Sequence, residues 1–200
     1  MIAHIKGTLE TKAADYVVID VGGLGYKVYI SATGMEKLGN IGDKVKVYTY
    51  YRVREDDISI FGFNTNEELR MFELILSVSG VGAKTAQTIV ALTNPSEFAI
   101  AIISDDISYL TQIPGIGAKS AQRIILELKD KIKKKKSITQ TKNTKVKEAI
   151  VDSNKVEEAI SALQVLGYNK KEIEKAFMKL DKKDLSTEDL IRKGLTILAN

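Results

Sequence analysis

The sequence reads LSVSGVGAKTA at residues 76–86 and returns to a closely similar pattern, LTQIPGIGAKSA, at residues 110–121. In both copies two glycines flank one apolar residue, and a lysine and an alanine follow at fixed positions. Two copies at one fixed offset indicate a repeated structural unit. The matching pairs, each separated by 35 positions, are Gly80 and Gly115, Gly82 and Gly117, Lys84 and Lys119, and Ala86 and Ala121.

The repeat predicts two helices joined by a tight turn. In the first copy we expect one helix to end near Val78 and the next to begin near Ala83, because the glycines between them permit unusual backbone angles. The first amides of a helix have no intrahelical partner and lie at the positive end of the helix dipole, so they bind anions. The pattern is typical of the helix-hairpin-helix motif, which binds DNA phosphates without reading bases.

Phosphate contacts are therefore predicted in both copies. The glycines admit a phosphate closely and the lysines add charge, while Val81 and Ile116 point into the core. Arg123, one turn beyond Lys119, is either a further phosphate contact or part of a solvated helix face. The alternative, a glycine pair that only joins two packed helices, is disfavoured by the second copy. The predicted phosphate-binding residues are Ser79, Gly80, Val81, Gly82, Lys84, Gly115, Ile116, Gly117, Lys119 and Arg123.

The first 63 residues read as β structure. Residues 16–21 and 26–30 are rich in β-branched and aromatic side chains, and residues 44–50 alternate with a period of two. With a further short strand at residues 58–63, about five strands predict a five-stranded OB-fold barrel. The glycines of residues 22–25 predict a hairpin turn and not a dinucleotide site, because a strand follows them and the G-x-G-x-x-G spacing is missing.

The rest of the chain reads as helical. Leu69, Phe72, Ile75 and Leu76 share one helix face, with residue 64, 65 or 66 as the N-cap. Three further helices are predicted after residue 151: Gly167 ends the first, and Ser186 with Asp189 opens the third. The fold class is thus a multidomain α+β protein, with a barrel at 1–63, a double helix-hairpin-helix domain at 64–130, a flexible basic linker at 131–151 and a UBA-like three-helix domain at 152–200.

The net charge of +4 is concentrated in one segment. Residues 1–129 carry 13 Lys/Arg and 15 Asp/Glu, residues 130–151 carry 8 and 2, and residues 152–200 carry 9 of each. The basic segment includes four consecutive lysines and then a polar run without periodicity, which predicts a self-repelling tether. The predicted DNA-binding region is slightly acidic.

Several function classes are excluded or disfavoured by composition. The chain has no cysteine and one histidine, His4, so thiolate and His-pair metal sites are excluded and a Ser-His-Asp triad is disfavoured. No apolar run reaches the 18 or more residues of a membrane span, no signal peptide is evident, and no P-loop motif for ATP is present. We expect no catalytic residues, no metal and no cofactor. Two alternatives stay open: a base-flipping repair enzyme using an aspartate such as Asp105, and a general adaptor.

The order of barrel, paired hairpins, charged linker and three-helix domain resembles the RuvA family along the whole chain. The most specific marks are the paired hairpins, the segment REDDISIFGF at residues 54–63 and Leu-Gly-Tyr at residues 166–168. Ala83 stands where many helix-hairpin-helix copies have proline, a departure that affects helix initiation and leaves the phosphate-binding amides in place.

The resemblance implies a non-catalytic scaffold that holds a four-way Holliday junction open and square. It further implies a homotetramer or octamer in the cytoplasm, recruitment of the hexameric RuvB ATPase for branch migration in recombination and repair, and RuvC resolvase as a partner. Glu55 and Asp56 then form an acidic pin that repels phosphates at the crossover, with Asp57 extending the cluster; from the residues alone they read as a solvated turn.

The last domain is the RuvB contact that the resemblance implies. Leu166, Tyr168 and one face of the third helix, around Leu195 and Leu198, are the candidate partner surface. The alternative for each of these side chains is the core of the domain itself. A net charge of zero over residues 152–200 argues against DNA binding there.

Overall fold

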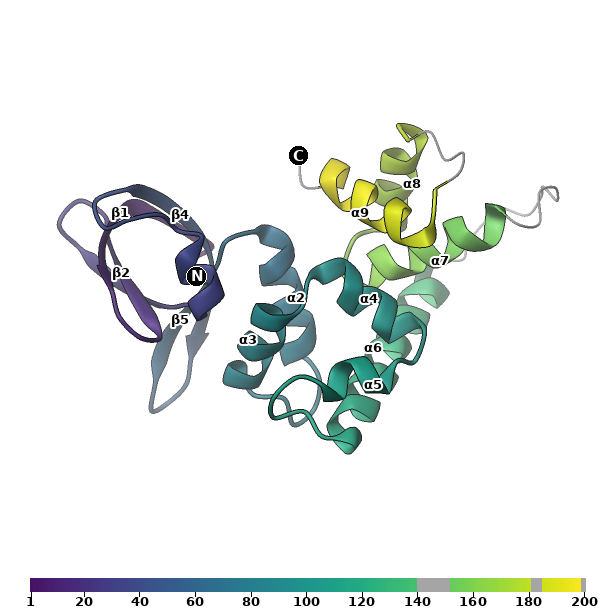
Figure 1. Ribbon diagram of the computed structural model, residues 1–200, viewed down its shortest axis with the longest axis horizontal. Helices are drawn as coiled ribbons and strands as arrows, with labels where there is room; N and C mark the ends of the chain where they lie inside the picture. The colour runs from purple at the N-terminus through teal and green to yellow at the C-terminus, as the bar shows by residue number, and fades with distance from the viewer. Residues whose placement is uncertain (140–151, 181–184, 199–200) are drawn as a thin grey trace. The chain divides into compact units, whose positions relative to one another are not determined.

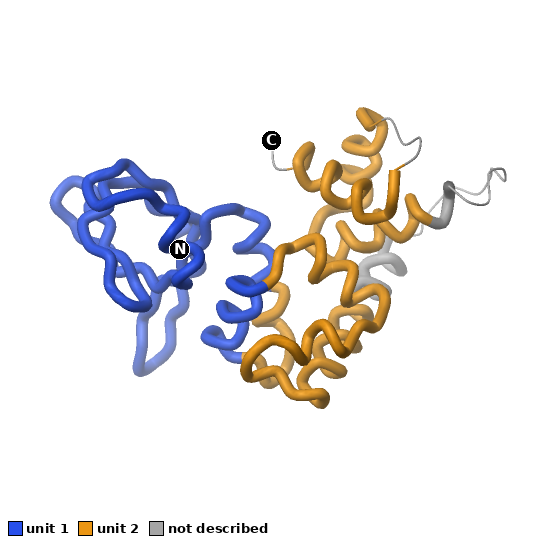
Figure 2. The backbone as a smooth tube through the Cα atoms, in the orientation of Figure 1, with its two compact units in different colours: residues 1–73, 82–92 blue, residues 74–81, 93–200 orange. Residues whose placement is uncertain are grey.

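The computed structural model describes residues 1–139, 152–180 and 185–198. The chain divides into two compact units, shown in blue and orange in Figure 2. The first unit holds Met1–Glu73 and Gly82–Leu92, and the second holds Leu74–Val81 and Thr93–Asn200.

The first unit contains a closed five-stranded barrel, which confirms the predicted fold class (Figure 1). Its strand order is β1-β2-β3-β5-β4, with every pairing antiparallel except the parallel contact of β3 with β5. The predicted hairpin turn between β2 and β3 is also confirmed, since Val21 N–H donates to Leu24 O over 2.9 Å. The strands are β1 (His4–Lys12), β2 (Tyr16–Asp20), β3 (Gly25–Tyr29), β4 (Lys44–Val53) and β5 (Ile58–Phe63).

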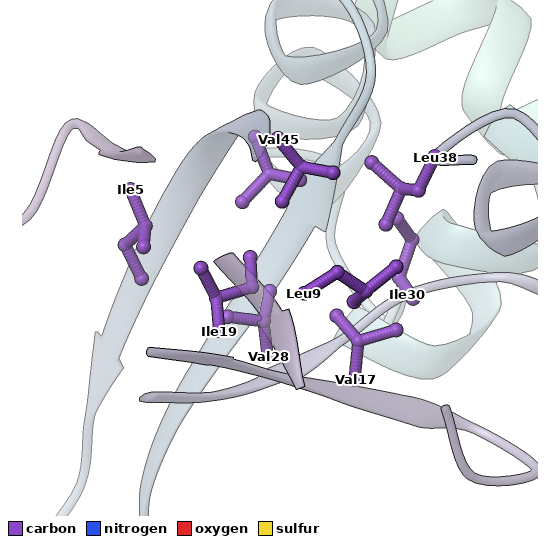
Figure 3. Packing of buried hydrophobic residues seen from close by; sticks show 9 residues of the cluster. Ile5, Leu9, Val17, Ile19, Val28, Ile30, Leu38 and Val45 are labelled. Carbon is purple, nitrogen blue, oxygen red and sulfur yellow. The ribbon is translucent and has the colours of Figure 1, made fainter. Parts of the chain in front are cut away.

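Alternating side chains of the strands fill the barrel. In β2 every second residue is buried, which is the pattern of a strand with one face toward a core. Figure 3 shows these side chains converging inside the barrel. The buried cluster consists of Ile5, Leu9, Val17, Ile19, Val28, Ile30, Leu38, Val45 and Val47.

Three helices complete the first unit. A short helix that the sequence did not predict, α1 (Ala32–Glu36), begins at Ser31, whose hydroxyl accepts from Gly34 N–H. Helix α2 (Asn66–Leu76) packs Phe72 against the rings of Tyr50, Phe61 and Phe63, at centroid distances of 5.2, 5.6 and 4.8 Å. Helix α3 (Ala83–Leu92) is tied to β3, since the Gln87 side chain donates to Tyr29 O.

After the segment Leu74–Val81, the second unit continues with α4 (Pro95–Ile103), α5 (Ile107–Thr111) and α6 (Ala118–Thr139). Buried apolar side chains hold these helices together, and Phe98, Ile102, Leu110, Ile124 and Leu128 are among the largest. Helix α6 runs nine residues into the segment predicted as linker from residue 131, because its lysines are good helix formers. Residues 140–151 of that prediction lie outside the described residues.

The last three helices agree with the prediction. They are α7 (Asp152–Val165), α8 (Lys170–Met178) and α9 (Thr187–Leu198). Gly167 has a φ of +86°, as expected of the residue that ends a helix. The Ser186 hydroxyl accepts from Asp189 N–H over 3.1 Å, which confirms the cap of α9, and the hydrogen bonds from Ser186 lower the pKa of Asp189.

Replacing Phe72 by alanine should destabilise the fold by about 3–5 kcal/mol, because it removes a fully buried ring in contact with three others. Urea denaturation followed by circular dichroism measures the change. The control is Leu24→Ala, whose side chain is 64% exposed and should shift stability by less than about 0.5 kcal/mol. Equal effects of the two substitutions would show that the aromatic cluster does not support the barrel.

Candidate nucleic-acid interface

The first hairpin is a tight turn between α2 and α3. Val78 N–H donates to Ile75 O over 3.0 Å, and Val81 N–H donates to Val78 O over 3.2 Å, so the turn closes on itself. Helix α3 then opens with a bond from Ala86 N–H to Gly82 O at 2.9 Å. The amides between the turn and this bond lie at the positive end of α3.

The second hairpin repeats this backbone bond for bond. Ile113 N–H donates to Leu110 O over 3.2 Å, and Ile116 N–H donates to Ile113 O over 3.0 Å. Helix α6 opens with a bond from Ala121 N–H to Gly117 O at 2.9 Å. Donors and acceptors are shifted by the same 35 positions as the sequence repeat, so the repeat is one of structure.

The first glycine of each hairpin is required by the backbone. Gly80 has a φ of +81° and Gly115 a φ of +85°, in the left-handed region where a side chain costs about 1–2 kcal/mol. This angle allows the chain to reverse between the two helices.

The second glycine of each hairpin is not required by the backbone. Neither Gly82 nor Gly117 has a positive φ, and a Cβ at either position would meet no atom within 4 Å. The fold would therefore accept alanine at both places. A glycine in open space at a helix start is expected where another molecule approaches the backbone closely.

Lys84 and Lys119 are exposed beside these amides. Within the described residues neither forms a salt bridge, so both charges are available to an anion. Val81 is half-buried and Ile116 is buried, so Ile116 anchors its loop in the core as predicted and Val81 does so in part. Each hairpin thus combines helix-start amides with one lysine.

Arg123 and Ser79 meet at the first loop. The Arg123 guanidinium donates to Ser79 O over 3.4 Å, and a hollow of about 130 Å³ opens beside this contact. The hollow joins the first loop to the start of α6, and its lining is Ser79, Gly80, Val81, Lys119, Ser120 and Arg123. Candidate phosphate-binding residues of both repeats therefore line the same hollow.

The helix that leads into the second hairpin is held to α4. The Tyr109 hydroxyl donates to a Glu97 carboxylate oxygen over 3.0 Å. Burial, together with this hydrogen bond, raises the pKa of Tyr109 to about 12, so the hydroxyl stays protonated and keeps donating at neutral pH.

The acidic residues between β4 and β5 divide into two kinds. Asp57 is used by the fold, since Ser59 donates to its carboxylate over 2.5 Å, Arg52 lies 3.9 Å away and Arg54 N–H donates to Asp57 O. Glu55 and Asp56 are exposed at the turn, and within the described part of the chain neither carboxylate has a hydrogen bond or ion pair. The hairpin of β4 and β5 extends away from the barrel (Figure 1).

The predicted partner residues are mostly in the core of the last three helices. Leu166 is 2% exposed and Tyr168 is 5% exposed, and Leu195 is half-buried. Leu166 and Tyr168 therefore shape this region from inside. Sequence reasoning missed Met178, an apolar side chain at the end of α8 that is 81% exposed.

Asp105, considered for a repair enzyme, and its neighbour Asp106 both have structural contacts. Asp105 pairs with Lys129, and the Asp106 carboxylate accepts from Tyr109 N–H as the cap of α5. Among the described residues no three His, Cys, Asp or Glu side chains gather as a metal site. No single helix in the described ranges is long and apolar enough to cross a membrane, although α3 and α4 pass that test as a bent pair.

The two loops define a tandem helix-hairpin-helix protein, a class that holds phosphate on backbone amides. Residues 72–130 match the family described as SAM-like helix-hairpin-helix tandem. The flanking regions match the RuvA N terminal domain at residues 1–62 and the RuvA C-terminal domain at residues 154–199. The chain belongs to the RuvA family.

Full-length relatives agree with this assignment. A protein of Acetivibrio thermocellus is 46% identical over 200 residues, which cover 100% of this chain and 99% of that protein. A protein of Ruminiclostridium cellulolyticum is 43% identical over 99% of this chain and 100% of its own length. One of Clostridium perfringens is 41% identical over 99% of both chains. Each is named "Holliday junction branch migration complex subunit RuvA".

The different demands on the two glycines predict different effects of alanine. Gly115→Ala should destabilise the protein by about 1–2 kcal/mol, because its positive φ is unfavourable for any side chain. Gly117→Ala should leave stability unchanged or raise it by up to about 1 kcal/mol, since its φ suits alanine and the space is open. Thermal unfolding by calorimetry distinguishes the two; a large loss at Gly117 would mean that the fold itself needs glycine there.

Proposed function

We propose that this chain binds four-way Holliday junctions as the non-catalytic subunit of a branch-migration complex in recombination and repair. The observation that carries the proposal is the pair of glycines, Gly82 and Gly117, that the fold does not need. The names of the full-length relatives supply the junction and the complex. In this proposal the chain consists of a barrel (1–63), a DNA-binding domain (64–130), a linker (131–151) and a motor-binding domain (152–200). It acts in the cytoplasm, where bacterial chromosomal DNA lies.

The proposed contacts are with phosphates. The backbone amides of Gly80 and Gly82, and those of Gly115 and Gly117, donate to the sugar-phosphate backbone, while Lys84 and Lys119 add charge. Ser79, Val81 and Ile116 fix the loops that carry these amides, and Arg123 lies beside the first of them. Such contacts position a duplex without reading its bases, so specificity comes from the shape of the DNA.

Shape recognition follows when several copies act together. In a homotetramer, or in two tetramers forming an octamer, each subunit offers two hairpins to one arm of the junction. Weak contacts then reinforce one another through effective concentration when the geometry matches. A linear duplex engages fewer hairpins and binds more weakly.

Glu55 and Asp56 form the proposed acidic pin. They lack partners within the described chain, whereas Asp57 beside them is held by Ser59, so only the first two are free to act on another molecule. In a four-fold assembly the pins of four subunits meet at the crossover. There they repel phosphates, which favours strand separation and an open junction.

The three-helix region contacts the motor in this proposal. Leu166 and Tyr168 support its surface from the core, and half-buried Leu195 on α9 contributes to the contact itself. The partner is the hexameric RuvB ATPase, which supplies the ATP hydrolysis. RuvC resolvase then acts on the same open junction.

A gel-shift comparison at fixed salt tests the junction proposal. The protein should bind a four-way junction about a hundredfold more tightly than a linear duplex of equal length. Gly82→Ala with Gly117→Ala should weaken junction binding, because methyl groups block the approach of phosphate, while thermal stability is kept. Equal affinity for junction and duplex would overturn the proposal, and unchanged affinity of the double variant would remove the hairpins from the interface.

The pin is tested by neutralising it. Glu55→Gln with Asp56→Asn should preserve or raise junction affinity, because two negative charges per subunit leave the DNA surface. It should also change the rate of branch migration by the motor complex, measured with a synthetic movable junction.

The control removes the same charge elsewhere on the first unit. Glu10 and Glu36 are exposed, so Glu10→Gln with Glu36→Gln should leave the migration rate as in the unmodified protein. If both double variants change the migration rate equally, the change in net charge is the cause, and Glu55 and Asp56 have no specific role at the crossover. An unchanged rate in the pin variant contradicts the proposal directly.

A further inference from the structure

One face of α6 reaches back to the first hairpin. Arg123, Glu127 and Lys131 are spaced four residues apart, so their side chains lie on the same side of the helix. Each of the three donates to or accepts from Ser77 or Ser79, which lie directly before the glycines of the other repeat. These contacts lie within the second unit.

The charges on this face match the polarity of the backbone they meet. The Glu127 carboxylate accepts from Ser79 N–H over 3.0 Å. Arg123 donates to Ser79 O over 3.4 Å, and Lys131 donates to both the carbonyl and the hydroxyl oxygen of Ser77 over 2.6 Å. The anion thus meets an N–H group and the cations meet oxygens, which makes the contacts charge-assisted hydrogen bonds.

Ser79 is the position at which the two repeats differ in the backbone itself. Thirty-five residues later stands Pro114, between residues that make the same turn bonds as their counterparts. Proline has a fixed φ and no N–H group. The second loop is therefore fixed by a ring at the place where the first loop has a residue without that restraint. This residue has one more donor, its N–H group, and Glu127 accepts from it.

We propose that Glu127 is a positioning residue for phosphate binding, doing for the first loop what Pro114 does for the second. Its carboxylate fixes Ser79 through the N–H group, with Arg123 and Lys131 holding the adjacent oxygens. The amides of Gly80 and Gly82 are thereby ordered before DNA arrives. The inference rests on the proposed function, since it assigns these amides to phosphate.

A carboxylate beside a phosphate-binding loop has two opposing effects on binding. A negative charge near a phosphate-binding loop repels the ligand. Ordering the loop beforehand removes an entropic cost that binding otherwise carries, so a carboxylate that holds the loop favours binding. The Glu127 carboxylate is half-buried and accepts a hydrogen bond from Ser79 N–H, so its negative charge is partly compensated by the protein backbone.

The experiment uses the full chain in five forms: unmodified, Glu127→Ala, Ser79→Pro, both together, and Glu127→Gln. Hydrogen exchange by NMR in the DNA-free protein measures the Val81 amide, whose bond to Val78 O closes the first turn. The Ile116 amide of the second turn is the internal reference. Four-way junction affinity is measured on the same samples, and Glu73→Ala, at an exposed residue of α2, controls for the loss of one negative charge.

Glu127→Ala should speed exchange at Val81 and weaken junction binding, each about tenfold, and leave Ile116 unchanged. Ser79→Pro in the Glu127→Ala background should restore both, because proline has no N–H group for Glu127 to hold and its ring fixes the loop as in the second repeat. Glu127→Gln keeps an acceptor and should stay within about threefold of the unmodified protein.

Other results would contradict either the role of Glu127 or the proposed function. Unchanged exchange at Val81 in Glu127→Ala shows that the carboxylate does not order the loop. Faster exchange with unchanged junction affinity makes the contact merely structural, and tighter binding in both Glu127 variants makes the charge a repulsive element instead. If the unmodified protein does not prefer junction to duplex, the proposed function fails, while the exchange data still decide whether Glu127 fixes the loop.

Discussion

The left-handed glycine in each hairpin is the constraint on which the interface depends. At Gly80 and Gly115 the chain turns through a φ near +80°, and the following bonds from Val81 and Ile116 close the turn. The next helix then begins, and its first amides have no intrahelical partner. In the proposed function, the lysines, the open glycines and the hollow beside Arg123 contribute only because this turn presents backbone donors together. The proposed phosphate binding is in this sense a property of the backbone, and the side chains adjust it.

The two turns reach the same geometry by different means. In the second, the ring of proline fixes the backbone at residue 114. In the first, the serine at residue 79 depends on Glu127, Arg123 and, through Ser77, Lys131. The two copies of the motif thus keep the same backbone hydrogen bonds. The second loop is fixed by a residue of its own, whereas the first is held by side chains of α6. The first turn is accordingly the one that a change in α6 is able to loosen.

This difference marks the limit of what the sequence revealed. The strands, the repeat and the stop at Gly167 follow from local rules, because alternation, glycine spacing and caps act within a few residues. The contact of Ser79 with Glu127 joins residues 48 apart, and no local pattern announces it. For the same reason the sequence left open whether Tyr168, which follows a helix stop, belongs to a partner surface or to the core, and the structure buries it. Hydrophobicity predicts that such a side chain is covered and does not say by what. Helix α1 was missed because its five residues are too few to show the helical period of 3.6 residues.

Net charge is a poor guide to this interface, and the structure supplies the reason. The excess of lysine lies in residues 130–151, while residues 1–129 carry more acidic than basic side chains. Yet the acidic side chains near the candidate sites are not equivalent. Asp105 and Asp57 are paired with cations and Glu127 holds an amide, so their charge is directed into the protein. Glu55 and Asp56 have no such partner in the described chain, and their field extends into solvent. In the proposed function, the phosphate-binding surface therefore tolerates carboxylates whose charge is already paired within the protein. Glu55 and Asp56, unpaired in the described chain, act on DNA as a separate, repulsive element.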